Sequence, residues 1–439
     1  MNHAFEIVVV GAGPAGLAAA TAAGFAGSRV ALLDDNPHVG GQIWRSSIGE
    51  SRQNRAKAFV VARFEASGAS LFRGCQVVDA NPAGHLSAWV EATQAWETFS
   101  FERLIIATGA RERFLPFPGW TLPGVFGAGG LQALVRGGFD IRGKRIAVAG
   151  TGPLLLAVAA HLKKDGADIA LVAEQAPLQR LMAFGLNLFS RPAKLFQGIR
   201  LRAELAGVPY RAGCWPVAAE RERNLQAVQF SNGLHTWTEH CDLLACGFHL
   251  VPNTELAILL GCIVGDHGVQ IDTNQQTSIP NLYCAGEPTG IAGVDAAMLQ
   301  GEIAGLAACG LAASAARLHR KRDAHAAFGR AMDRAFALRN ELRTLSEPDT
   351  IVCRCEDVRF AQLKAHATPQ SGWTDAKLQT RCGMGPCQGR VCGPAVNALF
   401  GWRNTSVRSP LFPIPIVALC SAPLSTTEVE IPDVLENYL

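Results

Sequence analysis

The feature that most constrains the fold is a glycine-rich turn that lies between a strand pattern and a helix pattern. A β-branched run at 7–10 leads into Gly11-Ala-Gly-Pro-Ala-Gly16, which is followed by an alanine-rich stretch at 17–26 and a second apolar run at 29–33. Short apolar runs on both sides of a helical stretch indicate buried parallel strands joined by a crossover helix. We therefore expect a βαβ unit at the start of the chain.

The residues of this turn have the types that a dinucleotide site requires. Gly11 permits the sharp turn, Gly13 lets a pyrophosphate approach the backbone, and Gly16 lets helix and strand pack closely. Free N–H groups and the positive dipole at the helix N-terminus favour phosphates. Asp34 ends the second strand and is a candidate acceptor for a ribose hydroxyl, with Asp35 as the alternative. The candidate contacts are thus Gly11, Gly13, Pro14, Ala15, Gly16, Asp34 and Asp35.

A second unit of the same kind follows at 146–172, with the turn Gly150-Thr-Gly-Pro-Leu-Leu155 between its first strand and its helix. Leu155 stands where the third glycine belongs, and its side chain obstructs the close packing that a bound dinucleotide exploits. Gly150 and Gly152 are still candidate contacts, and Glu174 could hold a ribose. Three alternatives stay open for this lobe: NAD(P), another nucleotide such as ATP, or a structural role.

Two such units imply an α/β fold with two Rossmann-like dinucleotide-binding lobes. Buried strands that end in tight turns recur at 104–110, 242–248 and 282–287. We assign them to the first lobe, so that the second lobe is inserted in it. The prolines near the C-terminus predict an extended tail without a helix. The expected parts are 1–142 and 242–312 for the first lobe, 143–241 for the second, 313–348 for a polar helical connector, 349–404 for a C-terminal module that carries the clustered cysteines and 405–439 for the tail.

Five of the thirteen cysteines lie between 353 and 392, whereas the other eight are scattered through apolar stretches. The cluster consists of Cys353, Cys355, Cys382, Cys387 and Cys392. In a reducing compartment, clustered cysteines hold metals or carry out redox chemistry more often than they form bridges. Four thiolates suffice for a [2Fe–2S] cluster, and structural zinc is the alternative. Spacing leaves the second pair of ligands ambiguous, because Cys382–Cys387 and Cys387–Cys392 are equally separated.

The composition excludes several functional classes. Lys and Arg number 40 against 37 Asp and Glu, without a basic block, so we expect no nucleic-acid partner. The N-terminal residues do not form a secretory signal, and no apolar run is long enough to span a membrane, which predicts a cytoplasmic protein. Neither lobe contains Cys-x-x-Cys, so a disulfide reductase is a poor match. We predict no catalytic acid or base, and interpret His38, His249 and His267 as loop or surface histidines.

Several motifs together resemble the FAD domain of the two-dinucleotide-binding-domain flavoproteins. They are the first glycine turn with Asp34, Gly40-Gly41-Gln42, Ala107-Thr108-Gly109 and Cys284-Ala-Gly286-Glu287. The resemblance implies bound FAD, with Gly41 and Gln42 near the isoalloxazine. It also implies a helix from Val294 that points its positive end at the flavin. Glu287 departs from the aspartate that is usual at its position by one methylene.

The second cysteine segment, Arg381 to Cys392, matches the pattern Arg-x-Gly-Met-Gly-x-Cys-Gln-Gly-x-x-Cys. This pattern is similar to that of small helical [2Fe–2S] domains related to bacterioferritin-associated ferredoxin. The resemblance implies that Cys353, Cys355, Cys387 and Cys392 are the ligands and that Cys382 is a spare cysteine. The glycines between them would bring backbone N–H groups close to the sulfides.

The order of these parts resembles, over nearly the whole chain, the α subunits of heteromeric FAD-dependent amino-acid dehydrogenases. That group includes D-hydroxyproline dehydrogenases, opine oxidases, hydrogen cyanide synthase and dye-linked proline dehydrogenase. The resemblance implies a catalytic, FAD-containing β subunit that oxidises the C–N bond of an amino or imino acid. It implies that this chain accepts those electrons, with an FMN at the interface as a candidate carrier and a small [2Fe–2S] γ subunit as a candidate partner.

Two alternative functions stay open. An NAD(P)H-dependent FAD/[2Fe–2S] reductase would use Gly150 and Gly152 to hold the nicotinamide cofactor, and Leu155 argues against it. A non-catalytic scaffold for the β subunit would carry vestigial cofactor sites, and the intact glycines and cysteines argue against that reading.

Overall fold

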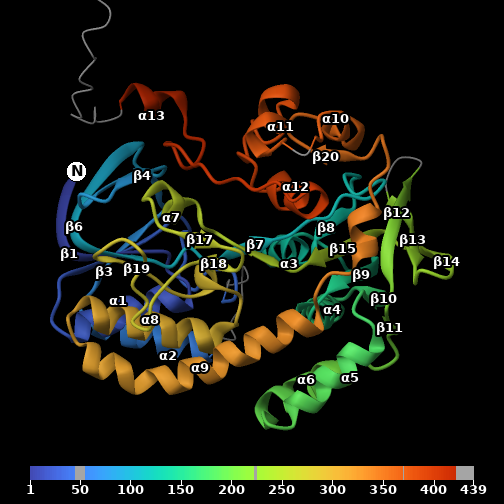
Figure 1. The fold of residues 1–439 in the computed structure, drawn as a ribbon. Helices are drawn as coiled ribbons and strands as arrows, with labels where there is room; N and C mark the ends of the chain where they lie inside the picture. Colours follow the sequence, from blue (N-terminus) through green and yellow to red (C-terminus); the bar gives the residue numbers. More distant parts are fainter. Residues whose placement is uncertain (45–54, 222–224, 369, 422–439) are drawn as a thin grey trace, which may run out of the picture.

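The computed structural model describes residues 1–44, 55–221, 225–368 and 370–421. Two α/β lobes lie next to each other, a long helix runs below both, and the cysteine-bearing segment lies above the junction between them in the view of Figure 1. Within the described ranges, the model contains no helix with the length and apolar character needed to cross a membrane.

The first lobe is built on a seven-stranded sheet in the order β3-β2-β1-β6-β5-β4, with β19 paired to β6. Its strands are β1 (Asn2–Val10), β2 (Val30–Asp34), β3 (Ser70–Arg73), β4 (Cys75–Asn81), β5 (His85–Val90), β6 (Ala95–Ile106) and β19 (Leu282–Cys284). β1 pairs in parallel with β2 and β6, and β19 pairs in parallel with β6. The predicted βαβ unit is confirmed.

Two helices made of small residues pack on this sheet with their backbones in contact. They are α1 (Pro14–Phe25) and α8 (Val294–Ala308), and α2 (Arg55–Ala66) packs beside α1. A Cβ on Gly301 would lie 2.0 Å from the carbonyl oxygen of Ala15, and one on Gly305 would lie 2.3 Å from that of Ala19. Close approach of this kind is possible only for glycine, and it holds the N-terminus of α8 near the first glycine turn.

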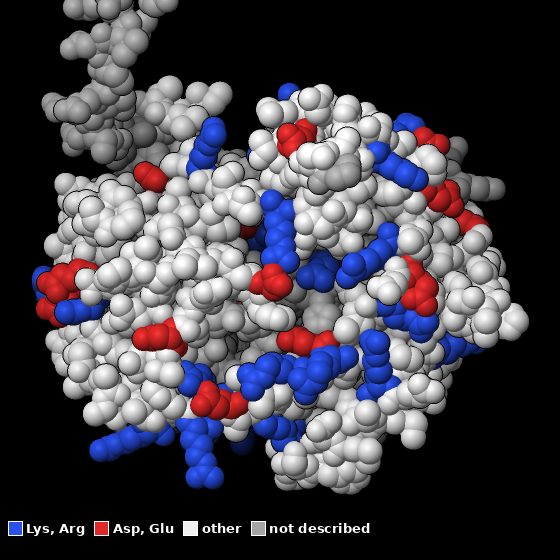
Figure 2. All heavy atoms as spheres, in the orientation of Figure 1, with Lys and Arg blue, Asp and Glu red and all other residues white. Residues whose placement is uncertain are grey.

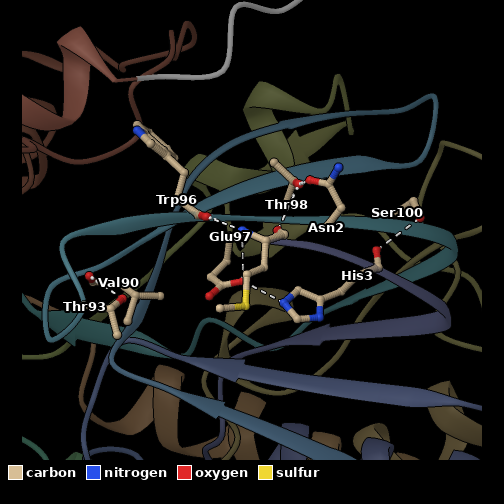
Figure 3. A network of polar contacts seen from close by, with 9 residues as sticks. Asn2, His3, Val90, Thr93, Trp96, Glu97, Thr98 and Ser100 are labelled. Atoms are coloured by element: carbon tan, nitrogen blue, oxygen red, sulfur yellow. Dashed lines mark hydrogen bonds and ion pairs between the residues drawn. The ribbon is translucent and has the colours of Figure 1, made fainter.

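Polar contacts tie the N-terminal end of β1 to β6 (Figure 3). The amino group of Met1 donates to the carbonyl oxygen of Trp96 at 2.8 Å, and Nε2 of His3 lies 2.6 Å from Oε2 of Glu97. The Ser100 hydroxyl donates to the carbonyl oxygen of His3 at 3.2 Å. These contacts lie at the end of β1 opposite the glycine turn, so they tie two central strands together away from the turn.

The second lobe is built on a five-stranded parallel sheet in the order β11-β10-β9-β15-β8. Its strands are β8 (Val125–Gly127), β9 (Arg145–Thr151), β10 (Asp168–Glu174), β11 (Tyr210–Ala212) and β15 (Leu243–Phe248), and an antiparallel sheet of β12 (Trp215–Arg221), β13 (Leu225–Ser231) and β14 (Thr236–His240) follows β11. The boundaries expected at 143 and 241 are therefore wrong. β15 pairs with β9 and β8, so the buried strand at 243–248 completes the second sheet instead of returning to the first.

Short elements surround and join the two sheets. A ladder of β7 (Ala110–Glu112) and β16 (Leu250–Pro252) links the lobes where the chain leaves and re-enters the first. The second lobe also holds α3 (Ala128–Arg136), α4 (Leu154–Lys164), α5 (Leu178–Leu188) and α6 (Pro192–Glu204). The first lobe also holds α7 (Glu255–Leu259), β17 (Val264–Gly265), β18 (Gly268–Val269) and the 3-10 turn η1 (Glu287–Thr289).

The predicted connector is helical over α9 (Ala312–Ala335) and ends in a 3-10 turn, η2 (Asn340–Thr344). α9 packs against α8 of the first lobe and α5 of the second (Figure 1). In the second contact, the ring centroids of Phe184 and Phe328 lie 5.8 Å apart. The connector is thus a structural element that contacts both lobes.

The C-terminal domain has its own small core, as expected. Its elements are β20 (Ile351–Cys353), β21 (Val358–Arg359), α10 (Phe360–Ala365), α11 (Trp373–Thr380) and α12 (Cys392–Phe400). Val352, Leu363, Trp373 and Val396 fill the space between them. Helical packing was predicted for this segment, and its three helices confirm that prediction.

The tail contains one helix, contrary to the prediction. α13 spans Ile416–Cys420 and begins directly after Pro415. A proline at the start of a helix removes no intrahelical hydrogen bond, so the prolines of the tail do not forbid a helix that follows them. The rest of the predicted tail, 422–439 with Pro423, lies outside the described residues.

Candidate flavin cavity and thiol cluster

The three glycines of the first turn differ in the space around them. A Cβ on Gly11 would lie 2.3 Å from the Ala107 carbonyl oxygen, and one on Gly16 would lie 1.8 Å from that of Gly11. A Cβ on Gly13 would meet nothing nearer than the Cα of Gly41, at 4.0 Å. Gly11 and Gly16 therefore serve packing, whereas Gly13 borders open space, as a backbone that receives a phosphate requires.

The carboxylate of Asp34 is held at the end of β2, next to this turn. The backbone N–H of Ala12 donates to its Oδ2 at 2.5 Å, and the backbone N–H and the side-chain amide of Asn36 donate to its Oδ1 at 2.8 and 2.9 Å. Asp34 is only 8% exposed. These donors orient the carboxylate toward the turn, where an acceptor for a ribose hydroxyl would be needed.

A cavity of about 530 Å³ opens along the turn and gathers most of the predicted contacts. The predicted residues that line it are Gly11, Gly13, Pro14, Ala15, Asp34, Asp35, Gly41, Gln42, Ala107, Thr108, Gly109 and Glu287. Gly16 and Gly286 do not line it. Gly286 instead accommodates Ala15, whose Cβ would lie 2.8 Å from a Cβ at that position. The open cradle at Gly13 and the oriented Asp34 carboxylate fit the pyrophosphate and ribose of FAD.

Part of the cavity wall consists of residues that the sequence analysis did not predict as cofactor contacts. These residues include Cys75, Gln76, Val77, Arg111, Asn253, Glu255, Arg390, Leu411 and Phe412. Arg111 donates to Oδ1 of Asn253 at 2.7 Å and pairs with Glu255 at 2.8 Å. Asn253 also donates to the carbonyl oxygen of Thr108 at 2.8 Å. No local sequence pattern marks these residues, because they meet only after the two lobes have folded.

Arg390 brings the C-terminal domain into this wall. It lies between Cys387 and Cys392, and its carbonyl oxygen accepts a hydrogen bond from Nε of Arg111 at 3.0 Å. Its guanidinium donates to the carbonyl oxygen of Leu411 at 2.5 Å and lies 4.1 Å from the centre of the Phe412 ring. Burial lowers the pKa of Arg390. The loop that carries two of the clustered cysteines thus forms one side of the candidate flavin cavity.

Glu287 lines the cavity from the N-terminus of the 3-10 turn η1. Burial raises the pKa of its carboxyl group. A raised pKa widens the pH range in which this group keeps its proton and can donate a hydrogen bond as well as accept one.

In the second lobe, the acid that matches Asp34 is more deeply buried than Asp34. Oε2 of Glu174 accepts the backbone N–H of Gly152 at 2.7 Å, and Oε1 accepts that of Ala176 at 2.8 Å. Glu174 is 1% exposed, and burial raises its pKa to about 7. A Cβ on Gly150 would lie 1.8 Å from the Gly247 carbonyl oxygen, so this glycine serves the packing of β9 on β15. Leu155, at the third glycine position, is buried in the core of the lobe.

The connector after α9 covers this second turn. Oγ1 of Thr151 lies 3.1 Å from the carbonyl oxygen of Phe336. The Gln175 amide reaches the same oxygen at 3.3 Å and accepts the backbone N–H of Arg339 at 3.1 Å. Residues 336–339 therefore lie across the carboxyl ends of β9 and β10, where the ribose of a nucleotide lies in a Rossmann lobe. This arrangement argues against a bound NAD(P).

The five clustered cysteines come together in the C-terminal domain, but not equally. The Sγ atoms of Cys353, Cys382 and Cys392 lie within 4.8 Å of one another, and all three residues are buried. Cys387 is half-buried, and its thiol interacts with those of Cys392 and Cys355. Cys355 is exposed. A set of thiols that converge in this way suits a soft metal centre such as a [2Fe–2S] cluster or zinc.

The glycines between these cysteines make room for other side chains. A Cβ on Gly383 would lie 2.6 Å from the Trp373 ring, and one on Gly389 would lie 2.8 Å from it. Nε1 of Trp373 is buried and finds no hydrogen-bond partner among the residues that the structure describes. Backbone N–H groups also approach the sulfur atoms, that of Gly383 at Cys353 and that of Gly389 at Cys387. Thiolates are stabilised by such donors, which are the second shell that a metal centre requires.

The histidines do not add acid–base chemistry to the cavity. Burial, together with the nearby Arg113, lowers the pKa of His249 to about 4. His38 and His267 do not line the cavity, and neither does His249.

Comparison with protein families identifies one match over most of the chain. The model of the pyridine nucleotide-disulphide oxidoreductase family matches residues 5–301. This range contains both lobes, from β1 to the first half of α8.

Two curated relatives match almost the whole chain. An opine oxidase subunit from Agrobacterium tumefaciens (strain Ach5) is 30% identical over 96% of this chain and 93% of its own length. The HcnB subunit of hydrogen cyanide synthase from Pseudomonas protegens is 29% identical over 96% of this chain and 98% of its own length. These alignments are long enough to include the cysteine-bearing domain as well as the two lobes.

Among solved structures, L-proline dehydrogenase from P. horikoshii is similar over the lobes and beyond. It superposes with a TM-score of 0.66 and 17% identity, and the match covers 94% of this chain and 79% of that one. Thioredoxin reductase from T. acidophilum superposes with a TM-score of 0.54 and 20% identity, over 70% of this chain and 98% of that one. At these identities the comparisons show the fold, an α/β arrangement of two Rossmann-like lobes.

Proposed function

The chain belongs to the pyridine nucleotide-disulphide oxidoreductase family, in the group of the opine oxidase and HcnB subunits, and on this basis we propose that it is the electron-transfer α subunit of a heteromeric flavoprotein dehydrogenase. The complex would oxidise an amino or imino acid of the D-hydroxyproline, opine, proline or glycine type. A catalytic FAD-containing β subunit would supply the electrons. FAD in the first lobe and a [2Fe–2S] cluster in the C-terminal domain would together convert two-electron into one-electron transfer.

The observation that carries the proposal is the position of Arg390. This residue belongs to the cysteine loop and lines the same cavity as Gly13 and Asp34. Its hydrogen bonds to Leu411 and from Arg111 hold the loop against the first lobe. The nearness of the cysteine loop to the candidate flavin cavity supports electron transfer between a flavin and a cluster in this chain.

The alternative function, an NAD(P)H-dependent reductase, is disfavoured by the second lobe. Glu174 is 1% exposed, and residues 336–339 cover the turn. The flavin would then receive electrons from a donor other than a nicotinamide in this lobe. A second protein subunit is the donor that the relatives suggest, since two of them are named as subunits of larger enzymes.

An FMN at the interface with the β subunit stays part of the proposal. Nε of Arg113 is buried without a hydrogen-bond partner in the described part of the chain, and burial, with the nearby Arg343, lowers its pKa. A phosphate would satisfy such a group. Figure 2 shows Lys and Arg side chains, with several Asp and Glu side chains among them, around a hollow in the middle of one face. A small γ subunit and a cytoplasmic location are predictions from the sequence.

The proposal is tested by anaerobic absorption and EPR spectra of the chain purified with its β subunit. Flavin bleaching and a reduced [2Fe–2S] signal are expected with the amino or imino acid and not with NADH. Reduction by NADH alone would support the reductase instead, and a colourless chain that contains zinc would contradict both.

A pair of variants tests whether Arg390 contributes to electron transfer between the flavin and the cluster. Arg390→Met removes the donors but keeps the apolar stem, and we expect it to slow reduction of the cluster relative to reduction of the flavin. Lys364→Met, on the exposed face of α10 in the same domain, is the matched control and should leave both rates unchanged. Equal behaviour of the two variants would refute the role of Arg390.

A further inference from the structure

The helical hairpin formed by α5 and α6 in the second lobe leaves a large apolar surface open to solvent. Six large apolar side chains in this hairpin are 58–71% exposed, namely Leu178, Met182, Leu186, Phe189, Phe196 and Ile199. At roughly 150 Å² for each fully exposed side chain, they present on the order of 600 Å² of apolar surface. Monomeric proteins rarely expose an apolar patch of more than a few hundred Å², so this surface is expected to contact another molecule.

The exposed apolar residues of α5 lie along one side of the helix, because Leu178, Met182 and Leu186 recur every four residues. The other side of α5 packs on the connector, where the ring centroids of Phe184 and Phe336 lie 5.3 Å apart. Every residue of α6 is at least partly exposed. A helix that is apolar on opposite sides is normally buried on both, and this chain covers only one side of α5.

The charged residues of the hairpin are nearly all cations. They are Arg180, Arg191, Lys194, Arg200 and Arg202, against the single acid Glu204. Three of the guanidinium groups donate to backbone carbonyl oxygens, which do not neutralise their charge. Arg200 pairs with Glu204 at 2.9 Å, and Lys194 pairs with Asp295 at 2.8 Å. The hairpin therefore has a net positive charge beside its apolar side chains, which is complementary to an apolar patch bordered by acids.

These features favour a protein over the other molecules that could cover the hairpin. A second copy of this chain would bring the same cations close together, which is unfavourable. The segment 178–204 contains no Trp or Tyr, the residues that gather at the surface of a bilayer. Its exposed Phe and Met side chains and its arginines are instead of the types enriched in protein interfaces. Each partner in such an interface contributes about 800 Å², most of which the hairpin can supply.

We propose that the exposed face of α5 and α6 is the docking surface for the β subunit, which presents an apolar patch bordered by acidic residues. The inference rests on the proposed function, because that function supplies the partner. The hairpin projects from the second lobe beside the end of α9, so a partner can reach it without moving either lobe (Figure 1). Phe189 and Phe196 are the expected anchors, since large aromatic side chains dominate the binding energy of interfaces.

The test measures the Kd between the full-length chain and the β subunit by biolayer interferometry. Leu186→Glu places a carboxylate on the apolar face, opposite the expected acids, and should weaken binding at least tenfold. Leu234→Glu makes the same change at an exposed leucine between β13 and β14 of the same lobe, and should keep the wild-type Kd. Equal Kd values for the two variants would overturn the proposal.

Two measurements on the wild-type chain are independent of how the variants fold. Backbone amides of α5 and α6 should exchange hydrogen more slowly in the complex than in the free chain, and unchanged exchange would overturn the docking site. Salt screens attraction between exposed charges, so the Kd should rise with salt concentration. A Kd that does not depend on salt would overturn the acidic character of the partner surface.

The other occupants give different results. A dimer of the chain alone that Leu186→Glu dissociates, with an unchanged Kd for the β subunit, would assign the hairpin to a second copy. Co-sedimentation of the complex with vesicles of phosphatidylcholine and phosphatidylglycerol, lost in Leu186→Glu at an unchanged Kd, would assign it to a lipid surface. Either result would overturn the proposal.

The same experiment separates this inference from the proposed function. A complex that forms but does not reduce this chain when the amino or imino acid is added would refute electron transfer, and the docking site would still be decided by the Kd values. A wild-type chain that does not bind the β subunit would refute both.

Discussion

Two alanine substitutions in the first glycine turn should have opposite effects on stability and on flavin binding. At Gly13, an added Cβ would meet no protein atom nearer than 4.0 Å, and φ of −73° with ψ of −176° is open to alanine. The folded apoprotein should therefore tolerate Gly13→Ala within about 0.5 kcal/mol. At Gly16, the added Cβ would lie 1.8 Å from the backbone oxygen of Gly11, so α1 or the turn must move by more than an ångström.

The magnitudes follow from these contacts. Overpacking of this kind costs about 1–3 kcal/mol, which for a domain of this size lowers the melting temperature by roughly 2–12 °C in Gly16→Ala. Gly13→Ala instead places a methyl group where the pyrophosphate approaches. Loss of a charge-assisted hydrogen bond there is worth about 1.5–3 kcal/mol, or roughly a tenfold to hundredfold weaker affinity for FAD.

The assay is thermal unfolding of the flavin-free chains, together with FAD titration followed by quenching of flavin fluorescence. Gly27→Ala is a control for the loss of a glycine, because its position is open, although its φ of +89° adds strain that is absent at Gly13. FAD binding by Gly13→Ala with wild-type affinity would refute the assignment of the pyrophosphate site. An unchanged melting temperature in Gly16→Ala would refute the packing argument.

Three further predictions concern the second lobe and the cysteine domain. Leu155→Gly should not allow NADH to reduce the flavin, because residues 336–339 still cover the turn. The cavity left by the leucine side chain should lower the free energy of unfolding by at least about 2–5 kcal/mol. Bleaching of the flavin by NADH in this variant would contradict a blocked nucleotide site. Burial raises the pKa of Glu174 from 4.5 to about 7, so the unfolded chain releases this proton first and the unfolding free energy falls between these pH values. Glu174→Gln should reduce this pH dependence, measured as the free energy of unfolding in urea at about pH 5 and pH 7.5. The same pH dependence in the variant and the wild type would contradict the role of Glu174. Gly389→Ala should lower the iron content, because its Cβ would lie 2.8 Å from the Trp373 ring. Gly401→Ala, also at positive φ but in open space, is the control and should keep the iron. Equal iron contents in the two variants would refute the argument that the Trp373 contact shapes the thiol cluster.

Features governed by local backbone sterics could be predicted from the sequence. The turn from Gly11 to Gly16 needs only the residues that flank it, because hard-sphere contacts decide which positions must be glycine. The strand at 7–10, the helix after it and the acid at the end of β2 were therefore predicted correctly, and twelve of the proposed contacts line one cavity. The helical character of the C-terminal domain was implied by the resemblance of Arg381 to Cys392 to small helical [2Fe–2S] domains, and the structure has helices α10, α11 and α12 there.

How these parts meet depends on contacts between distant segments. The strand at 243–248 is equally apolar in either lobe, and its pairing with β9 assigns it to the second sheet. The cover over the second turn comes from residues 336–339, more than 160 residues away along the chain from Gln175. Spacing likewise leaves Cys382 and Cys392 equivalent as partners of Cys387, because the number of residues between two cysteines does not fix where their side chains point. Local sequence patterns thus determined the strands, the helices and the types of residue at the candidate sites. Long-range packing decided which thiols converge and which loop borders the candidate flavin cavity, because those contacts join segments that are far apart in the sequence.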